Sequence, residues 1–295
     1  MFSNVLVGVD GHTGGGDAIV LASQLTAADA QLTLAHVYPS HSDVRRRSYR
    51  EYEAAESARA RELLTAARDQ AGVSAKLRWR GCTSAGRGLH ELAELHDSDL
   101  LAVGSARRGL FGRVMLGDDT RAALDGAPCA VAVAPAGYAK RPEMIRRIGV
   151  GYDGSPDSQR ALAVARSLAG ELDASLAALE VVSIPAYLLP GPGAGDTASI
   201  DELINDARDR VASIGDVEPH GAYGQAAEEL ARWGATVDLL VVGSRGYGPV
   251  GRLVHGSTSR ALATAAQCPL LVLTRSAPVF SWPRAADVDR AGLAT

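Results

Sequence analysis

The chain has 295 residues, of which 46% are apolar and 22% are charged. This length favours two domains, and this composition is typical of a globular protein. The net charge of −4 argues against a nucleic-acid-binding protein, which usually carries a clustered basic face. No apolar stretch approaches the roughly 18 residues of a membrane-spanning helix. We therefore expect no nucleic acid and no membrane as a partner.

The cysteines and the N-terminal sequence give information on the cellular compartment of the protein. Cys82, Cys129 and Cys268 are odd in number and show no CxxC spacing, so they suggest neither a disulfide framework nor a zinc site. The first apolar run begins at Val5, without the basic segment and apolar core of a secretory signal. These features predict a cytoplasmic protein.

In the first half of the chain, short apolar runs alternate with segments whose apolar residues recur at helical spacing. Strands are predicted near 4–9, 31–37, 75–80, 99–103 and 129–133. Helices are predicted near 15–28, 51–71, 87–96 and 118–126. A segment rich in basic residues over 136–147, with Gly and Pro, is predicted as a linker.

The second half shows the same alternation. Strands are predicted near 147–152, 175–182, 217–223, 238–242 and 269–273. Helices are predicted near 156–170, 200–213, 225–234 and 257–265. Such alternation implies right-handed βαβ units and a parallel sheet with helices on both faces, which is the α/β, doubly wound (Rossmann-like or flavodoxin-like) fold class.

The two halves are copies of one another. The run Val5–Gly11 returns as Ile148–Gly154, and Asp99–Gly104 returns as Asp238–Gly243. Repetition of whole elements in the same order indicates two tandem domains. We expect the first domain over 1–138, the second over 144–276, and a C-terminal tail over 277–295.

A glycine pattern follows the fourth strand of the second copy. Gly243 and Gly246 come directly after an apolar run, and Gly256 and Ser257 open the next predicted helix. Glycines at the end of a parallel strand can adopt positive φ and let the backbone approach a ligand. Free N–H groups, a hydroxyl and the positive end of a helix dipole favour an anion at the helix start. The pattern therefore predicts a phosphate site.

A second loop ends at the same edge of the predicted sheet. Asp153 follows the first strand of the second copy, beside the strand that ends at Gly243. Its carboxylate is a candidate ligand for a nucleoside or for Mg²⁺. The alternative is an Asx-turn within Asp-Gly-Ser-Pro, which needs no ligand.

The first copy departs from this pattern. Arg107 stands where the second copy has Gly246, and Asp118 stands where it has Ser257. A carboxylate about 4 Å from a phosphate costs roughly 4 kcal/mol at an effective dielectric constant near 20. We expect one good phosphate site, in the second copy, and one impaired site.

These residues resemble the universal stress protein family in its tandem two-domain form. The most specific element is the motif G-x₂-G-x₉-G-[ST], which the second copy meets in full. The resemblance implies a five-stranded parallel sheet in each domain and an adenine nucleotide, ATP or another, as cofactor, carried with or without Mg²⁺. It also implies association through the last strands, as a homodimer or an internal pseudo-dimer.

The resemblance assigns binding positions residue by residue. In the second copy, contacts to the nucleoside, the adenine, the ribose and the phosphates are expected from Gly151, Tyr152, Asp153, Val181, Gly243, Gly246, Gly256, Ser257 and Thr258. In the first copy the corresponding positions are Asp10, Val37, Gly104 and Gly117. No residue is expected to act as a catalyst.

The function that these features predict is an ATP-binding stress-response or regulatory module whose nucleotide occupancy biases the binding of an unidentified protein partner. No general base is placed to orient a water molecule, so any ATP hydrolysis is expected to be slow. Two alternatives stay open, a slow ATPase or adenylating enzyme on the same fold and a nucleotide-free interaction domain. Cyclic AMP is an open alternative as ligand.

Overall fold

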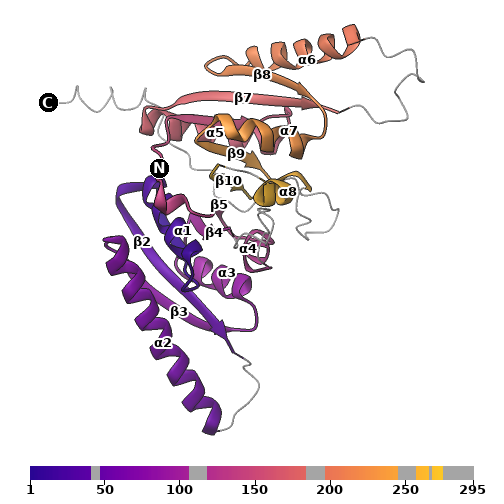
Figure 1. Cartoon of the computed structure of the whole chain (residues 1–295). Coiled ribbons are helices and arrows are strands. Elements are labelled where there is room, and N and C mark those ends of the chain that lie inside the picture. The colour runs from indigo at the N-terminus through magenta and orange to yellow at the C-terminus, as the bar shows by residue number, and fades with distance from the viewer. Residues whose placement is uncertain (41–46, 106–117, 184–196, 245–256, 266–267, 275–295) are drawn as a thin grey trace, which may run out of the picture.

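The computed structural model of the chain describes residues 1–40, 47–105, 118–183, 197–244, 257–265 and 268–274 (Figure 1). None of the helices within these ranges is both long enough and apolar enough to cross a membrane. The predicted C-terminal tail lies outside the described residues.

The first half contains strands and helices in strict alternation. The strands are β1 (Phe2–Gly8), β2 (Thr26–Pro39), β3 (Lys76–Cys82), β4 (Leu100–Gly104) and β5 (Ala130–Ala134). The helices are α1 (Thr13–Leu25), α2 (Arg47–Ala71), α3 (Ala85–Leu95) and α4 (Asp118–Leu124), followed by a short 3₁₀ turn, η1 (Tyr138–Lys140).

The second half repeats this order. The strands are β6 (Arg147–Gly151), β7 (Ser175–Val182), β8 (Glu218–Tyr223), β9 (Leu239–Gly243) and β10 (Leu270–Leu273). The helices are α5 (Pro156–Leu172), α6 (Thr197–Ala212), α7 (Ala226–Trp233) and α8 (Ser257–Ala265), with a 3₁₀ turn, η3 (Gly234–Thr236), after α7. The predicted strands and helices are thus confirmed within a few residues, except at the boundary between α1 and β2, where the strand predicted near 31–37 already begins at Thr26.

The exception is the end of α1, which was predicted to reach residue 28. The helix ends at Leu25, and Thr26 already has extended backbone angles and pairs with Phe2 of β1. The Thr26 hydroxyl donates to the carbonyl of Ala22, 2.6 Å away, which satisfies one of the last helical acceptors. Pairing of Thr26 with Phe2 ends the helix there, and after an irregularity the ladder with β1 resumes at Gln31.

All ten strands form one sheet, in the order β3-β2-β1-β4-β5-β10-β9-β6-β7-β8. Neighbours within each half are parallel, whereas β5 and β10 pair antiparallel. The middle pair of that ladder joins Ala132 to Leu271, which hold equivalent positions in the two copies. The two halves therefore meet through their last strands about an approximate two-fold axis (Figure 1).

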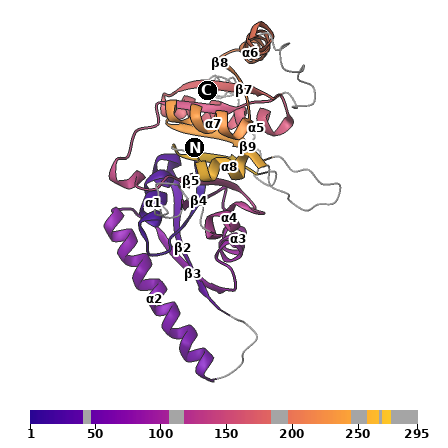
Figure 2. The same cartoon turned by 45° about the vertical axis from the view of Figure 1, so that its right-hand side comes forward.

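Helices cover both faces of the sheet, as Figure 2 shows for the first half, with α1 and α2 on one side and α3 and α4 on the other. One apolar core lies under α1, α2, α5 and α6 and includes Leu21, Leu64 and Leu168. A second core lies under α3, α4, α7 and α8 and includes Leu89, Leu230 and Leu262. Each half is a doubly wound α/β domain, and the predicted fold class is confirmed.

An aspartate, buried in the first half and half-buried in the second, fixes the start of the first strand in each half. The carboxylate of Asp99 accepts the backbone N–H groups of Ser3 and Asn4, at 2.7 and 3.0 Å. The carboxylate of Asp238 accepts those of Arg146 and Arg147, each at 2.8 Å. This repeated contact satisfies strand N–H groups that have no ladder partner, which is the physical reason for an aspartate before β4 and β9.

The linker is fastened to α1. The carboxylate of Asp17, 3% exposed, accepts the N–H groups of Gly137 and Ala139, both at 2.8 Å. Tyr138 packs into the core beside α1, and its hydroxyl donates to the side-chain oxygen of Gln24 at 2.9 Å. The segment after β5 therefore lies along α1 and is hydrogen-bonded to it. The sequence alone predicted a linker and gave no sign of these contacts.

Candidate functional site

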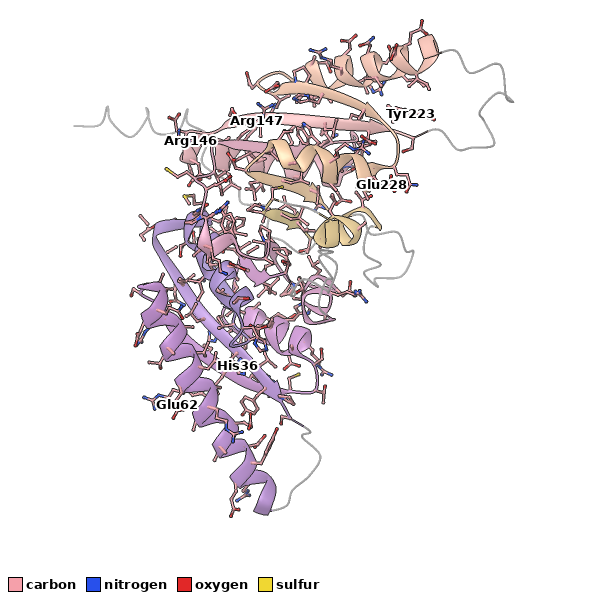
Figure 3. All side chains as sticks on the ribbon, in the orientation of Figure 1. His36, Glu62, Arg146, Arg147, Tyr223 and Glu228 are labelled. Atoms are coloured by element: carbon pink, nitrogen blue, oxygen red, sulfur yellow. The ribbon has the colours of Figure 1, made fainter. Side chains whose placement is uncertain are left out.

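The candidate site of the second half lies where the winding of the sheet reverses. Strands β6 and β9 are parallel neighbours, so both end at the same edge. Helix α5, which follows β6, packs on one face, whereas α8, which follows β9, packs on the other. Ligands of open α/β sheets bind in the crevice between two such strand ends. In Figure 3 this edge is the side of Tyr223 and Glu228, and Arg146 and Arg147 lie at the opposite edge.

The turn after β6 is built by its own side chains. The N–H of Tyr152 donates to the carbonyl of Leu179 at 2.9 Å, which continues the ladder with β7. A carboxylate oxygen of Asp153 accepts the N–H of Ser155 at 3.1 Å, and Gly154 has φ of 74°. The Asx-turn interpretation of Asp153 is therefore confirmed. A contact of the exposed Asp153 carboxylate with a nucleoside or Mg²⁺ stays a prediction.

Two serines that the sequence analysis did not assign to the site complete this turn. Ser155 is the N-cap of α5, and its hydroxyl accepts the N–H of Ser158 at 3.2 Å. The Ser158 hydroxyl in turn accepts the N–H of Asp153 at 3.3 Å. The signal was present in the sequence, because Ser followed by Pro at the first helical position is a strong helix start. These bonds fix Asp153 relative to α5.

Gly243 lies against the backbone of a helix. Its φ is not in the left-handed region, so the turn here does not use the positive φ that a glycine allows. A Cβ built on Gly243 would lie 2.6 Å from the backbone oxygen of Asp157, in the first turn of α5. The missing side chain therefore makes room for the backbone of α5. The loop between β6 and α5 is thereby held against the end of β9.

The remaining predicted residues of the second copy divide into two groups. Gly151 ends β6, and Val181 in β7 is half-buried against the core under α7 and pairs with Ala222 of β8. Ser257 begins α8 as predicted, and Thr258 in the first turn is half-buried. Gly246 and Gly256 lie outside the described residues.

The first copy repeats the turn with different side chains. A carboxylate oxygen of Asp10 accepts the N–H of His12 at 2.9 Å, and Gly11 has φ of 80°. A Cβ on Gly104 would lie 2.3 Å from the oxygen of Gly14 in α1, which repeats the close approach at Gly243. Val37 packs against α3. Asp118 begins α4, whereas Arg107 and Gly117 lie outside the described residues.

Beside the two sites, β2 and β7 carry different polar groups. In the second half Arg210 of α6 donates three hydrogen bonds to the carboxylate of Glu180, at 2.7, 3.0 and 3.2 Å, and this hydrogen bonding raises the pKa of the arginine. In the first half His36 takes the place of Glu180, and its Nδ1 lies 2.6 Å from the carbonyl oxygen of Val9 (Figure 3). The ion pair joins α6 to the strand next to β6, and sequence spacing gave no signal for it.

Two cysteines can be excluded as nucleophiles at neutral pH. Burial raises the pKa of Cys129 and of Cys268 from 9.0 to about 12 in both cases. Only the thiolate is a good nucleophile or metal ligand. Within the described part of the chain, no group of three or more His, Cys, Asp or Glu side chains is arranged to hold a metal ion. The described residues therefore provide no resident metal centre.

The chain thus consists of two tandem doubly wound α/β domains, each with a crevice at the switch point of its sheet. The model of the Universal stress protein family matches residues 1–135 and, a second time, residues 144–274. The chain therefore belongs to the universal stress protein family, as the resemblance of its motifs implied.

Individual relatives agree with this assignment. A universal stress protein of Mycobacterium tuberculosis (strain ATCC 25618 / H37Rv) is 29% identical over 188 residues, which cover 61% of this chain and 63% of that protein. The chain therefore matches less than two thirds of the length of this relative. A universal stress protein of Thermus aquaticus is 33% identical over 138 residues, which cover 44% of this chain and 99% of that protein.

A solved structure supports the fold of the whole chain. The universal stress protein from Archaeoglobus fulgidus DSM 4304 superposes with a TM-score of 0.65 and covers 92% of this chain and 99% of its own. The two sequences are 18% identical, so the similarity concerns the fold alone.

Proposed function

We propose that the protein binds an adenine nucleotide, ATP in the first place, in the crevice between β6 and β9 of its second half. The carrying observation is the complete G-x₂-G-x₉-G-S motif, which begins at the end of β9 and ends at the first residue of α8. In this proposal the N–H groups at the start of α8 bind the phosphates, because a helix N-terminus favours anions.

The rest of the proposed site follows from the strands next to β9. Tyr152 and Asp153 follow Gly151, the last residue of β6, and would meet the nucleoside. The backbone of Val181 on β7 would meet the adenine. Gly243 would lie at the ribose, and Gly246, Gly256, Ser257 and Thr258 would surround the phosphates. Any Mg²⁺ would enter with the triphosphate, with Asp153 as its candidate carboxylate ligand.

The corresponding positions in the first half are Asp10, Val37, Gly104 and Gly117, and we propose that this site is impaired. Asp118 stands at the start of α4, where the second half offers Ser257 at the start of α8. At about 4 Å from a phosphate, its carboxylate would lower affinity about a thousandfold.

The proposed role is regulatory. Nucleotide occupancy would change how the crevice edge is presented to a protein partner, in a cytoplasmic protein of the stress response. We assign no catalytic residue, so we expect hydrolysis of ATP well below the roughly 1 s⁻¹ of a slow dedicated enzyme. Substrate-dependent release of pyrophosphate would instead favour an adenylating enzyme on this fold.

The test is a titration of the full chain with ATP in a calorimeter, combined with mass spectrometry of any small molecule that the purified protein releases on denaturation. We expect one tight site per chain. Ser257→Asp, which copies the first half, should weaken binding about a thousandfold. The matched control, Asp118→Ser, should leave the tight site unchanged.

Two results would contradict the proposal. Two sites of equal affinity would show that Asp118 does not impair the first half. No binding of ATP, ADP, AMP or cyclic AMP by the full chain would favour the interaction-domain alternative.

A further inference from the structure

The outer side of α5 carries a hollow near its first turns. The hollow is shallow and open to solvent, with a volume of about 750 Å³, and the described residues that line it are Pro156, Asp157, Gln159, Arg160 and Ala163. It lies next to the candidate site, because the backbone of Asp157 packs against Gly243. The lining side chains mix polar and apolar groups, so the hollow suits a segment of polypeptide with both kinds of side chain.

The equivalent side of α1 is partly covered by the chain itself. Asp17 of α1 corresponds to Arg160 of α5, and its carboxylate accepts the N–H groups of Gly137 and Ala139. Gln24, two turns further along α1, donates to the carbonyl of Glu143 at 3.1 Å. The segment that follows β5 thus runs along α1 from its first turns to its last.

The chain leaves β10 at the same place relative to α5 as it leaves β5 relative to α1. Ala134 pairs with Gly104, and its carbonyl accepts the N–H of Ser105 at 2.8 Å. Leu273 pairs with Gly243, and its carbonyl accepts the N–H of Ser244 at 2.9 Å. Since α1 packs on Gly104 as α5 packs on Gly243, the two exits are equivalent.

The hydrogen-bonding groups on α1 and α5 differ, and the backbone groups of the segments that follow β5 and β10 differ to match them. Ala139, whose N–H donates to Asp17, corresponds to Pro278, which has no N–H. Where the first half offers a carboxylate acceptor, the second half offers the guanidinium of Arg160. That group is ion-paired with Asp157 but one third exposed, so it keeps donors for backbone carbonyls.

The side chains at equivalent positions of the segments after β5 and β10 also differ in size. Tyr138, which packs beside α1, corresponds to Ala277, which is far smaller. The next aromatic residues of the sequence are Phe280 and Trp282. The lining residues of α5 span about 10 Å of helix, which fewer than five extended residues can follow. The 21 residues after Thr274 are thus long enough to reach and fill the hollow.

We propose that the segment 275–283 of this chain docks in the hollow on α5, with Arg160 donating to its backbone carbonyls and Phe280 or Trp282 filling the space left by Ala277. The segment would then hold the first turn of α5 against Gly243. This proposal does not depend on nucleotide binding.

Disulfide trapping in the full chain tests this docking. Gln159→Cys, on the rim of the hollow, is combined with Ser281→Cys, which keeps both aromatic residues, in a Cys82→Ser background that removes the half-exposed native thiol. The matched control is Gly170→Cys with Ser281→Cys, since Gly170 is exposed on the same helix about 16 Å further along. We expect the Gln159 pair to close at least tenfold faster than the Gly170 pair within one chain.

A second arm removes the proposed donor without changing the thiols. Arg160→Gln should slow closure of the Gln159 pair at least threefold, whereas Arg166→Gln, on the same helix but bonded to the carbonyl of Gly215, should not change it. Equal closure rates at Gln159 and Gly170 would overturn the proposal. A disulfide that forms only between two chains would also overturn it, because the hollow would then take the tail of a second copy.

Discussion

The turns that lead into α1 and α5 have nearly the same backbone but different side chains. In both, an aspartate accepts the N–H two residues ahead, and the next residue is a glycine of positive φ. Ser155 then caps α5 through its hydroxyl, whereas His12, at the same place before α1, makes no capping side-chain bond. The path of the turn thus depends on Asp-Gly, and the polar groups around it have changed independently.

The glycines at the ends of β4 and β9 show the opposite behaviour, because both copies keep them. At each, the backbone of a helix occupies the space of a side chain. The comparison indicates that the copies agree where helix and strand backbones touch, whereas the side chain that precedes the helix, His12 or Ser155, has changed. Substitutions made in pairs, one in each half, can test this distinction.

The largest effect is expected at these glycines. Gly104→Ala and Gly243→Ala place a Cβ 2.3 and 2.6 Å from backbone oxygens that cannot move without shifting α1 or α5. Each should lower the free energy of unfolding by about 3 kcal/mol, as measured by urea denaturation. The controls are Gly16→Ala and Gly170→Ala, where a Cβ meets nothing within 4 Å. These should stabilise by about 0.5–1 kcal/mol; a control as destabilising as its partner would refute the packing argument.

The aspartates that hold the strand starts should give the next effect. Asp99→Asn keeps one acceptor but turns an amide toward the second N–H, so it should cost about 2–3 kcal/mol of unfolding free energy. Asp238→Asn should cost about 1–2 kcal/mol, because Asp238 is half-buried and Asp99 is 5% exposed. Urea denaturation measures both, with the exposed Asp69→Asn as control. A larger loss at Asp238 than at Asp99 would show that burial does not set the difference.

The helix caps should give a smaller difference. Ser155→Ala removes the bond to the N–H of Ser158 and should cost about 1 kcal/mol of stability. His12→Ala removes no side-chain bond to the N–H groups of the helix start and should cost less than Ser155→Ala, whereas His12→Ser should gain up to about 1 kcal/mol. Thermal unfolding followed by circular dichroism resolves these values. Equal losses for the two alanine variants would mean that the caps do not distinguish the halves.

The buried thiols should show no difference between the copies. Since burial raises the pKa of both Cys129 and Cys268 to about 12, neither should react with iodoacetamide at pH 8 in the folded chain. The half-exposed Cys82 should react, and mass spectrometry counts the labels. Unfolded thiols ionise near pH 9.0, so stability should fall as the pH rises from about 9 to 12. Labelling of one buried cysteine before the other would contradict the equivalence of the two environments.

Periodicity and repetition predicted the fold well, because local spacing largely determines which residues can face a core. They failed at Thr26, where pairing with a distant strand decides the structure. The pairing of β5 with β10 could be predicted only from the family resemblance, because no local pattern shows which edge strands of the two domains pair.

The site was predictable only in part. The aspartate and glycine of the turn after β6 act locally, and their Asx-turn follows from their order in the chain. The reason for Gly243 is a contact with Asp157, from a different element, so no window of sequence around the glycine reveals it. The same holds for Glu180 and Arg210, which come together only when α6 packs on β7.

The antiparallel ladder at the centre of the sheet has a consequence for access. Because strand direction inverts between β5 and β10, the carboxyl ends of the first half and those of the second lie on opposite borders of one continuous sheet. The β6–β9 crevice and the β1–β4 crevice therefore belong to different borders of the sheet, with β5 and β10 between them. Duplication has given this chain two crevices rather than one enlarged one.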